Sequence, residues 1–138
     1  MQEGMLLHFL AAPHSGTDVE QVIGYIDERL DPLAFEYAWQ QLLDRHEGLR
    51  LRFSIDAAGH ARQWPVSGVT IRVDLEDWSG ESASVQEQRF EAYLQQDRRR
   101  GFDPRSELLI RVRVFRLAAE RHRFAWTWWH GILDGRSR

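Results

Sequence analysis

The sequence predicts a mixed α/β fold, an α+β sandwich in which helices pack on a mixed, largely antiparallel sheet. Two observations support this class. Several segments of strand length alternate apolar and polar residues, while two longer segments carry apolar residues at helical spacing. The predicted order is helix, strand, helix, strands, helix, strand, strand. Such an order places helices on a sheet better than it builds a helical bundle or a closed barrel.

Length and composition predict a single soluble domain. The chain has 138 residues, of which 43% are hydrophobic and 28% charged. This is enough apolar material for one core and too little chain for two domains. Aromatic residues reach 12%, with six Trp, so large buried surfaces are expected.

The same composition argues against several classes of function. Cysteine is absent and every one of the 18 cationic side chains is Arg, so neither thiolate nor lysine chemistry is available. A net charge of −3 does not favour nucleic acid. No apolar run is long enough to span a membrane and no signal peptide is recognisable, so a cytoplasmic location is expected.

The first third of the chain predicts a helix, a strand and a second helix. Residues Gln2–Leu10 place apolar side chains on one helical face, and a loop follows through Asp18. Val19–Leu30 alternates as a strand. Asp31 and Pro32 then suit the cap and first position of a helix that ends near His46 and Gly48.

The middle of the chain predicts three strands. Leu49–Ile55 alternates apolar residues with Arg and Ser, and the turn at Ala58-Gly59 leads into a returning strand over Ala61–Val66. Val69–Leu75 is the third alternating segment.

The last third predicts a long helix and a hairpin. Ser82 or Ser84 caps a helix that runs to about Arg100, and the Gly101–Pro104 segment ends it. Two strands follow, over Leu108–Leu117 and Arg123–Trp129, with the chain turning at Arg121-His122.

The chemistry-bearing segment is the aromatic strand Trp126–Trp129 and the residues after it. His130 follows the strand directly, and Asp134 and Gly135 come shortly afterwards. An imidazole can take a proton from an amine or a hydroxyl near neutral pH. Two interpretations stay open from these residues alone: a working site, or a histidine at a strand end followed by an ordinary Asp-Gly turn.

Other candidate segments have simpler interpretations. The run from Arg45 to Arg50 fits a helix C-terminus with favourable cations and a glycine break. Arg98–Arg100 fits a solvated helix end. The remaining histidines show no ligand spacing, so no metal is expected, and neither a phosphate-binding glycine loop nor a G-x-S-x-G turn is present.

Four segments in this order resemble the N-terminal half of a condensation domain from non-ribosomal peptide synthetases. Residues 2–9 are similar to the end of the opening motif, and 45–53 resemble the RHExLRTxF block, with Leu51 where Thr is usual. Phe102-Asp-Pro with Leu108–Arg111 resembles the FDL…PLLR strand. Residues 129–135 resemble the signature HHxxxDG, with Trp129 in place of the first histidine.

The resemblance implies one of two lobes that are each similar to chloramphenicol acetyltransferase. Residues 1–138 would be the N-terminal lobe, with the second lobe absent. Family members form an amide in a tunnel between the lobes. Two carrier proteins deliver the donor and the acceptor there as phosphopantetheine thioesters. No cofactor bound by the lobe itself is implied.

The same resemblance assigns roles to the motif residues. His130 would position or deprotonate the attacking amine, and Gly135 would lie beside the reaction centre. Asp134 would be structural, paired with Arg45 or with an arginine of the missing lobe. Arg50 and Trp129 would also be structural members of their motifs.

Two expectations follow for the chain alone. Without the second lobe it should have little or no condensation activity, and its uncovered apolar surface should promote self-association. Two other functions stay open. The first is a degenerate lobe that binds a carrier or partner domain without catalysis, which Trp129 favours. The second is an ester-forming acyltransferase relative.

Overall fold

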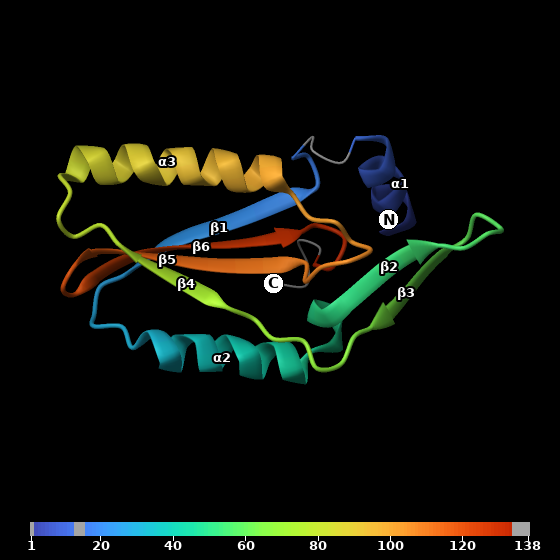
Figure 1. Cartoon of the computed structure of the whole chain (residues 1–138), viewed down its shortest axis with the longest axis horizontal. Coiled ribbons are helices and arrows are strands. Elements are labelled where there is room, and N and C mark those ends of the chain that lie inside the picture. Colours follow the sequence, from blue (N-terminus) through green and yellow to red (C-terminus); the bar gives the residue numbers. More distant parts are fainter. Residues whose placement is uncertain (1, 13–15, 134–138) are drawn as a thin grey trace.

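The computed structural model describes residues 2–12 and 16–133. A four-stranded sheet lies between two helices, and a small hairpin extends from one end of it (Figure 1). The elements are α1 (Gln2–Ala11), β1 (Val19–Ile26), α2 (Pro32–Arg45), the 3-10 turn η1 (Glu47–Arg50), β2 (Leu51–Ile55), β3 (Ala61–Pro65), β4 (Val73–Asp77), α3 (Ala83–Arg100), β5 (Ile110–Ala118) and β6 (Arg121–Trp129).

The sheet has the order β1-β6-β5-β4. The central strand β6 pairs antiparallel with both β1 and β5, and β4 joins β5 in parallel. Strands β2 and β3 form a separate antiparallel hairpin. The prediction of a mixed, largely antiparallel sheet with helices packed on it is therefore confirmed.

Both predicted helix caps are present. The Asp31 carboxylate accepts hydrogen bonds from the amides of Leu33 and Ala34 at 3.0 and 3.3 Å, with Pro32 at the first helical position. The Ser82 hydroxyl accepts from the Val85 amide at 3.2 Å, so Ser82 rather than Ser84 begins α3. These contacts satisfy amides that a helix start leaves without partners.

Several predicted strand bounds were wrong. Strand β1 ends at Ile26, and β4 begins at Val73 instead of Val69. The backbone before β4 bonds instead to the Gln40 side chain, which donates to the Val69 carbonyl and accepts from the Ile71 amide, both at 2.9 Å. Side-chain contacts from a distant helix thus replace ladder hydrogen bonds that the alternation predicted.

Two further differences concern turns. Residues Glu47–Arg50 form a 3-10 turn, so β2 begins at Leu51 and not at Leu49. His122 lies inside β6, opposite Ile26 and Arg116, and is only 2% exposed, whereas a turn was predicted there.

One face of the sheet is closed by α3. The Phe115 ring is buried between the Trp78 ring, stacked at 4.1 Å, and the edges of Phe90 and Tyr93 at 5.6 and 5.0 Å. Burial, and after it the nearby Asp97 carboxylate, raises the pKa of Tyr93 to about 12. This cluster fixes α3 along the strands.

An ion pair between a buried Asp97 and a partly buried Arg111 also holds α3. The Arg111 guanidinium donates to the Asp97 carboxylate at 2.8 Å and to the carbonyls of Gly101 and Asp97 at 2.6 and 3.0 Å. It lies 3.9 Å above the Phe102 ring centroid. Burial lowers the pKa of Arg111, against the effect of Asp97. Arg111, the last residue of the segment that resembles the FDL…PLLR strand, therefore connects β5 to α3.

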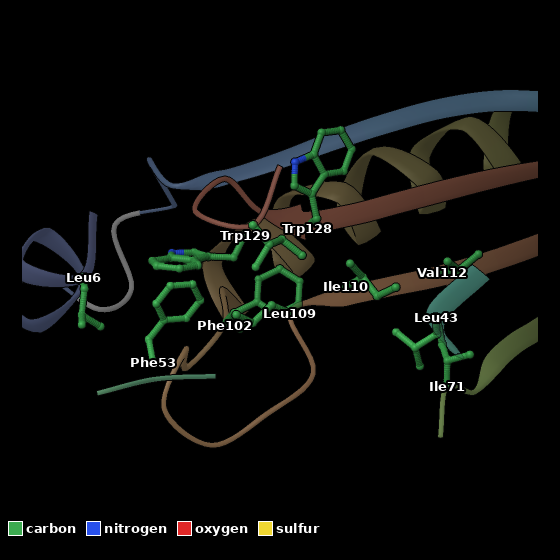
Figure 2. Close-up of a cluster of buried hydrophobic side chains, with 11 residues drawn as sticks. Leu6, Leu43, Phe53, Ile71, Phe102, Leu109, Ile110, Val112, Trp128 and Trp129 are labelled. Carbon is green, nitrogen blue, oxygen red and sulfur yellow. The ribbon is translucent and has the colours of Figure 1, made fainter. Parts of the chain in front are cut away.

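The larger core lies where the sheet meets α1, α2 and the hairpin. Figure 2 shows its buried side chains, among them Leu6 from α1, Leu43 from α2 and Phe53 from β2. The indoles of Trp128 and Trp129 point in different directions, and that of Trp129 lies over the Phe53 ring. This core supports the end of β6 from which His130 follows.

Candidate active site

His130 follows the central strand of the sheet. Its backbone amide donates to the Asp18 carbonyl at 2.8 Å, which continues the β1–β6 ladder one residue beyond the pair Val19–Trp129. Because hydrogen bonds between neighbouring strands set their register, this bond fixes the position of the His130 backbone from which the imidazole extends. The His130 side chain is 26% exposed, so it is accessible while its backbone is anchored.

A carboxylate from β1 contacts the His130 ring. Oε1 of Glu20 lies 2.5 Å from Nδ1 of His130, at ion-pair distance though without the alignment of an ideal hydrogen bond. Glu20 is directly opposite Trp128, two residues before His130, so the contact is a diagonal pair on one face of the sheet. The Asp18 carboxylate nearby is occupied by His8 at 2.6 Å.

Trp129 lies in the core rather than beside the His130 ring. Its side chain is 1% exposed, and its ring centroid is 5.1 Å from that of Phe53 in an edge-on arrangement. A methyl group added at Gly131 would collide with the indole. The turn that carries His130 therefore rests on the Trp129 ring, and only glycine at 131 leaves the room for it.

The two motif arginines occupy different environments. Arg50 donates to the carbonyls of Leu43 and Val66, both at 2.8 Å, and so joins the end of α2 to the residue that follows β3 of the hairpin. Arg45 is exposed, and within the described residues no ion pair involves it. Asp134 and Gly135, named with them from the sequence, lie outside the described residues.

An apolar groove opens on the α2 face of the sheet. It has a volume of about 1040 Å³ and a wide mouth. The Trp39 and Trp126 rings meet in it at 5.3 Å, and Leu133, three residues after His130, also lines it. Arg45 and His46 form part of its rim. The His130 side chain is not part of the lining, but Ile132 and Leu133, which follow it closely in sequence, are. A large, mostly apolar concavity is the kind of surface that binds a mostly apolar ligand.

The described residues contain no group of three or more His, Cys, Asp or Glu side chains arranged to hold a metal ion. Among these same residues, no helix combines the length and apolar character needed to cross a membrane.

Sequence reasoning did not identify Glu20 or Gly131. Glu20 is far from His130 in sequence, and only the pairing of the first and last strands brings them together. If the pairing of Val19–Ile26 with Arg121–Trp129 had been known, the alternation of the two strands would have placed Glu20 and His130 on the same face of the sheet. No sequence pattern indicated that position 131 requires glycine, because the side chain that fills the space there is Trp129, which is unusual at its motif position.

The sequence matches the condensation-domain family over residues 1–138. It is 38% identical over 135 residues to a linear gramicidin synthase of Brevibacillus parabrevis, a match that covers 98% of this chain and 3% of that protein. It is 35% identical over 142 residues to bacitracin synthase 3 of Bacillus licheniformis, a match that covers 100% of this chain and 2% of that protein.

Solved structures agree on the fold. The starter condensation domain of rhizomide synthetase RzmA superposes with a TM-score of 0.84 at 21% identity, over 98% of this chain and 32% of that chain. The first condensation domain of the calcium-dependent antibiotic synthetase, in complex with a substrate analogue, gives a TM-score of 0.81 at 20% identity, over 94% and 31%.

The chain thus spans a small part of these synthetases and about a third of the solved domain chains. Its match nevertheless runs from its first residue to its last, and the fold agrees with the sequence match. The chain therefore belongs to the condensation-domain family of the non-ribosomal peptide synthetases.

Proposed function

We propose that this chain is the N-terminal lobe of a condensation domain that forms an amide between a donor and an acceptor held on carrier proteins as phosphopantetheine thioesters. The observation that carries the proposal is His130. Its backbone is fixed by the central strand and its ring is 26% exposed, with Nδ1 against a carboxylate. Family membership supplies the reaction class.

In this mechanism His130 acts on the acceptor amine. The ring accepts a proton from the amine, or holds the amine for attack on the donor thioester carbonyl, and then stabilises the tetrahedral intermediate. The carbonyl carbon gains the new C–N bond and loses its bond to the donor thiol, which leaves with a proton. Asp134 is proposed to be structural, paired with Arg45 or with an arginine of a second lobe, and Gly135 is proposed to lie beside the reaction centre.

Trp129 is compatible with catalysis. Its indole is buried on Phe53 and points into the core, so replacing a histidine there changes packing rather than the reacting ring. The alternative, a lobe that only binds a carrier or partner domain, rests on this substitution. The retained accessible His130 favours the catalytic proposal.

The His130 substitution tests the proposal directly. We expect His130→Ala, in this chain continued to the length of a complete condensation domain, to reduce amide formation between two loaded carriers by about 10²–10⁴-fold. His60→Ala is the matched control, because His60 is 73% exposed on the hairpin turn. Equal turnover for His130→Ala and wild type would contradict a catalytic role for His130 and would favour a lobe that only binds a carrier or partner domain.

The acceptor separates amide from ester formation. Offering an amine and an alcohol acceptor on the same carrier to the same domain should give turnover with the amine. Faster turnover with the alcohol would identify the ester-forming relative instead, since one imidazole can activate either group.

The groove is proposed to face the second lobe. Its lining by Trp39, Trp126 and Leu133 leaves apolar surface that a partner would cover. The 138-residue chain alone should accordingly self-associate and show little or no condensation, because two tethered substrates are no longer held together. Sedimentation over a wide concentration range measures this, and a strictly monomeric mass would contradict it. A cytoplasmic location is part of the same proposal.

A further inference from the structure

Glu20 occupies the position from which a carboxylate can control the imidazole. Its Oε1 lies 2.5 Å from Nδ1 of His130, and the Glu20 side chain is 28% exposed. Nδ1 itself is shielded from solvent. The exposed quarter of the His130 side chain is therefore the part that does not include Nδ1.

The backbone holds the two residues in this relation. Glu20 is opposite Trp128 in the ladder, and the His130 amide is bonded to the Asp18 carbonyl two residues before Glu20. Both residues thus follow from the same β1–β6 register, which has eight Cα pairs from Val19–Trp129 to Ile26–His122. A pair set by strand register keeps its geometry without help from flexible loops.

No other carboxylate near the start of β1 is equally placed among the described residues. The Asp18 carboxylate is engaged by His8 at 2.6 Å. On the other face, Gln21 donates to the Leu94 carbonyl and the Asp97 carboxylate, and so belongs to the contact with α3. Glu20 and Gln21 therefore lie on opposite faces of β1. Glu20 contacts the imidazole, whereas Gln21 holds the strand against α3.

From this geometry we infer that Glu20 is the positioning residue of the site, resting on the proposed role of His130 as the base. The Nδ1–Oε1 contact is at ion-pair distance without hydrogen-bond alignment, and an ionised carboxylate can only accept, so the tautomer that this contact favours carries its proton on Nδ1. The lone pair then resides on Nε2, the nitrogen left to take a proton from the acceptor amine. As positive charge develops on the ring during proton transfer, the carboxylate stabilises it.

Two functions of the carboxylate can be separated by substitution. Glu20→Met keeps the length of the side chain and removes the acceptor. Glu20→Gln keeps an acceptor oxygen and removes the charge. Glu87→Met is the matched control, since Glu87 makes a comparably short contact, 2.6 Å to Arg123, through which α3 is joined to β6.

The first measurement is spectroscopic and requires no turnover. Long-range nitrogen–proton NMR of the imidazole in the 138-residue chain should show the Nδ1–H tautomer of His130 in wild type, Glu20→Gln and Glu87→Met. Glu20→Met should shift the ring toward the Nε2–H tautomer that predominates in free histidine. An unchanged His130 spectrum in Glu20→Met, with the fold intact by circular dichroism, would overturn the inference.

The second measurement is kinetic, in this chain continued to complete domain length. Glu20→Met should lower kcat for amide formation about 10–100-fold with KM changed less than about twofold, because binding of the substrates is untouched. Glu20→Gln should recover part of that loss, and Glu87→Met should match wild type. If His130→Ala is inactive while Glu20→Met retains full kcat, the inference about Glu20 fails alone. If His130→Ala is active, the proposed function fails, and the NMR result still decides whether Glu20 sets the tautomer.

Discussion

The two faces of the four-stranded sheet are completed differently. On the α3 face, aromatic rings close around Phe115, and the largely buried Arg111–Asp97 ion pair is supported by two more bonds from Arg111 to backbone carbonyls. On the α2 face, two indoles line a groove of about 1040 Å³ that the described residues leave open. The α3 face is closed by packed side chains, whereas the α2 face, which also contributes Leu43 to the larger core, leaves apolar surface open. Stability and the proposed chemistry should therefore respond to different substitutions.

The largest effect on stability is expected for Phe115→Ala. The Phe115 side chain is fully buried and touches three aromatic rings, so its loss leaves a cavity and should lower the free energy of unfolding by about 3–5 kcal/mol. Urea denaturation measures this. Leu42→Ala, at the groove and 42% exposed, should cost less than about 1 kcal/mol. Similar costs for both would abolish the contrast between the faces.

Arg111→Met should be nearly as damaging. It leaves the buried Asp97 carboxylate without its cation and two carbonyls without a donor, which should cost about 3 kcal/mol. The double variant Arg111→Met/Asp97→Leu removes both charges and should recover much of the loss. If the double variant is less stable than the single one, the ion pair is not what fastens α3.

Gly131→Ala tests how closely the core approaches the site. The new methyl group would meet the Trp129 ring, so a loss of about 1–3 kcal/mol is expected. Trp129→Phe removes the atoms involved, and the double variant should show a favourable coupling energy of at least about 0.5 kcal/mol in a denaturation cycle. Additive costs would mean that the turn does not rest on the indole.

The smallest effect concerns alkaline pH. The pKa of Tyr93 is raised to about 12 in the folded chain, above its usual value near 10. Its contribution is fully present below about pH 10 and is lost as the pH rises through 12. After allowance for partial exposure, the loss should be about 1 kcal/mol or less. Denaturation at pH 9 and above 11, in wild type and Tyr93→Phe, measures it; an identical pH dependence in both would contradict it.

Most of the local structure could be predicted from the sequence, and so could the candidate residue His130, but the contact of His130 with Glu20 could not. Caps at Asp31 and Ser82, alternation in β5 and β6, and the break at Gly101 are encoded by nearby residues, and the structure contains them. The late start of β4 depends on Gln40, and the His130 contact depends on Glu20, each from a distant segment. Such contacts follow from which elements become neighbours, and local patterns do not specify that.

The strand order also determines when the site can exist. Strand β4, helix α3 and strand β5 follow one another and form a local parallel unit, whereas β1 must wait for β6, the last strand of the described residues. Contacts between distant segments form late, because closing a long loop has an entropic cost. During synthesis Glu20 is made early, and it can contact His130 only after the segments between β1 and the end of β6 have been synthesised. The proposed base would therefore be assembled at the end of folding, so that incompletely folded chains lack an oriented imidazole.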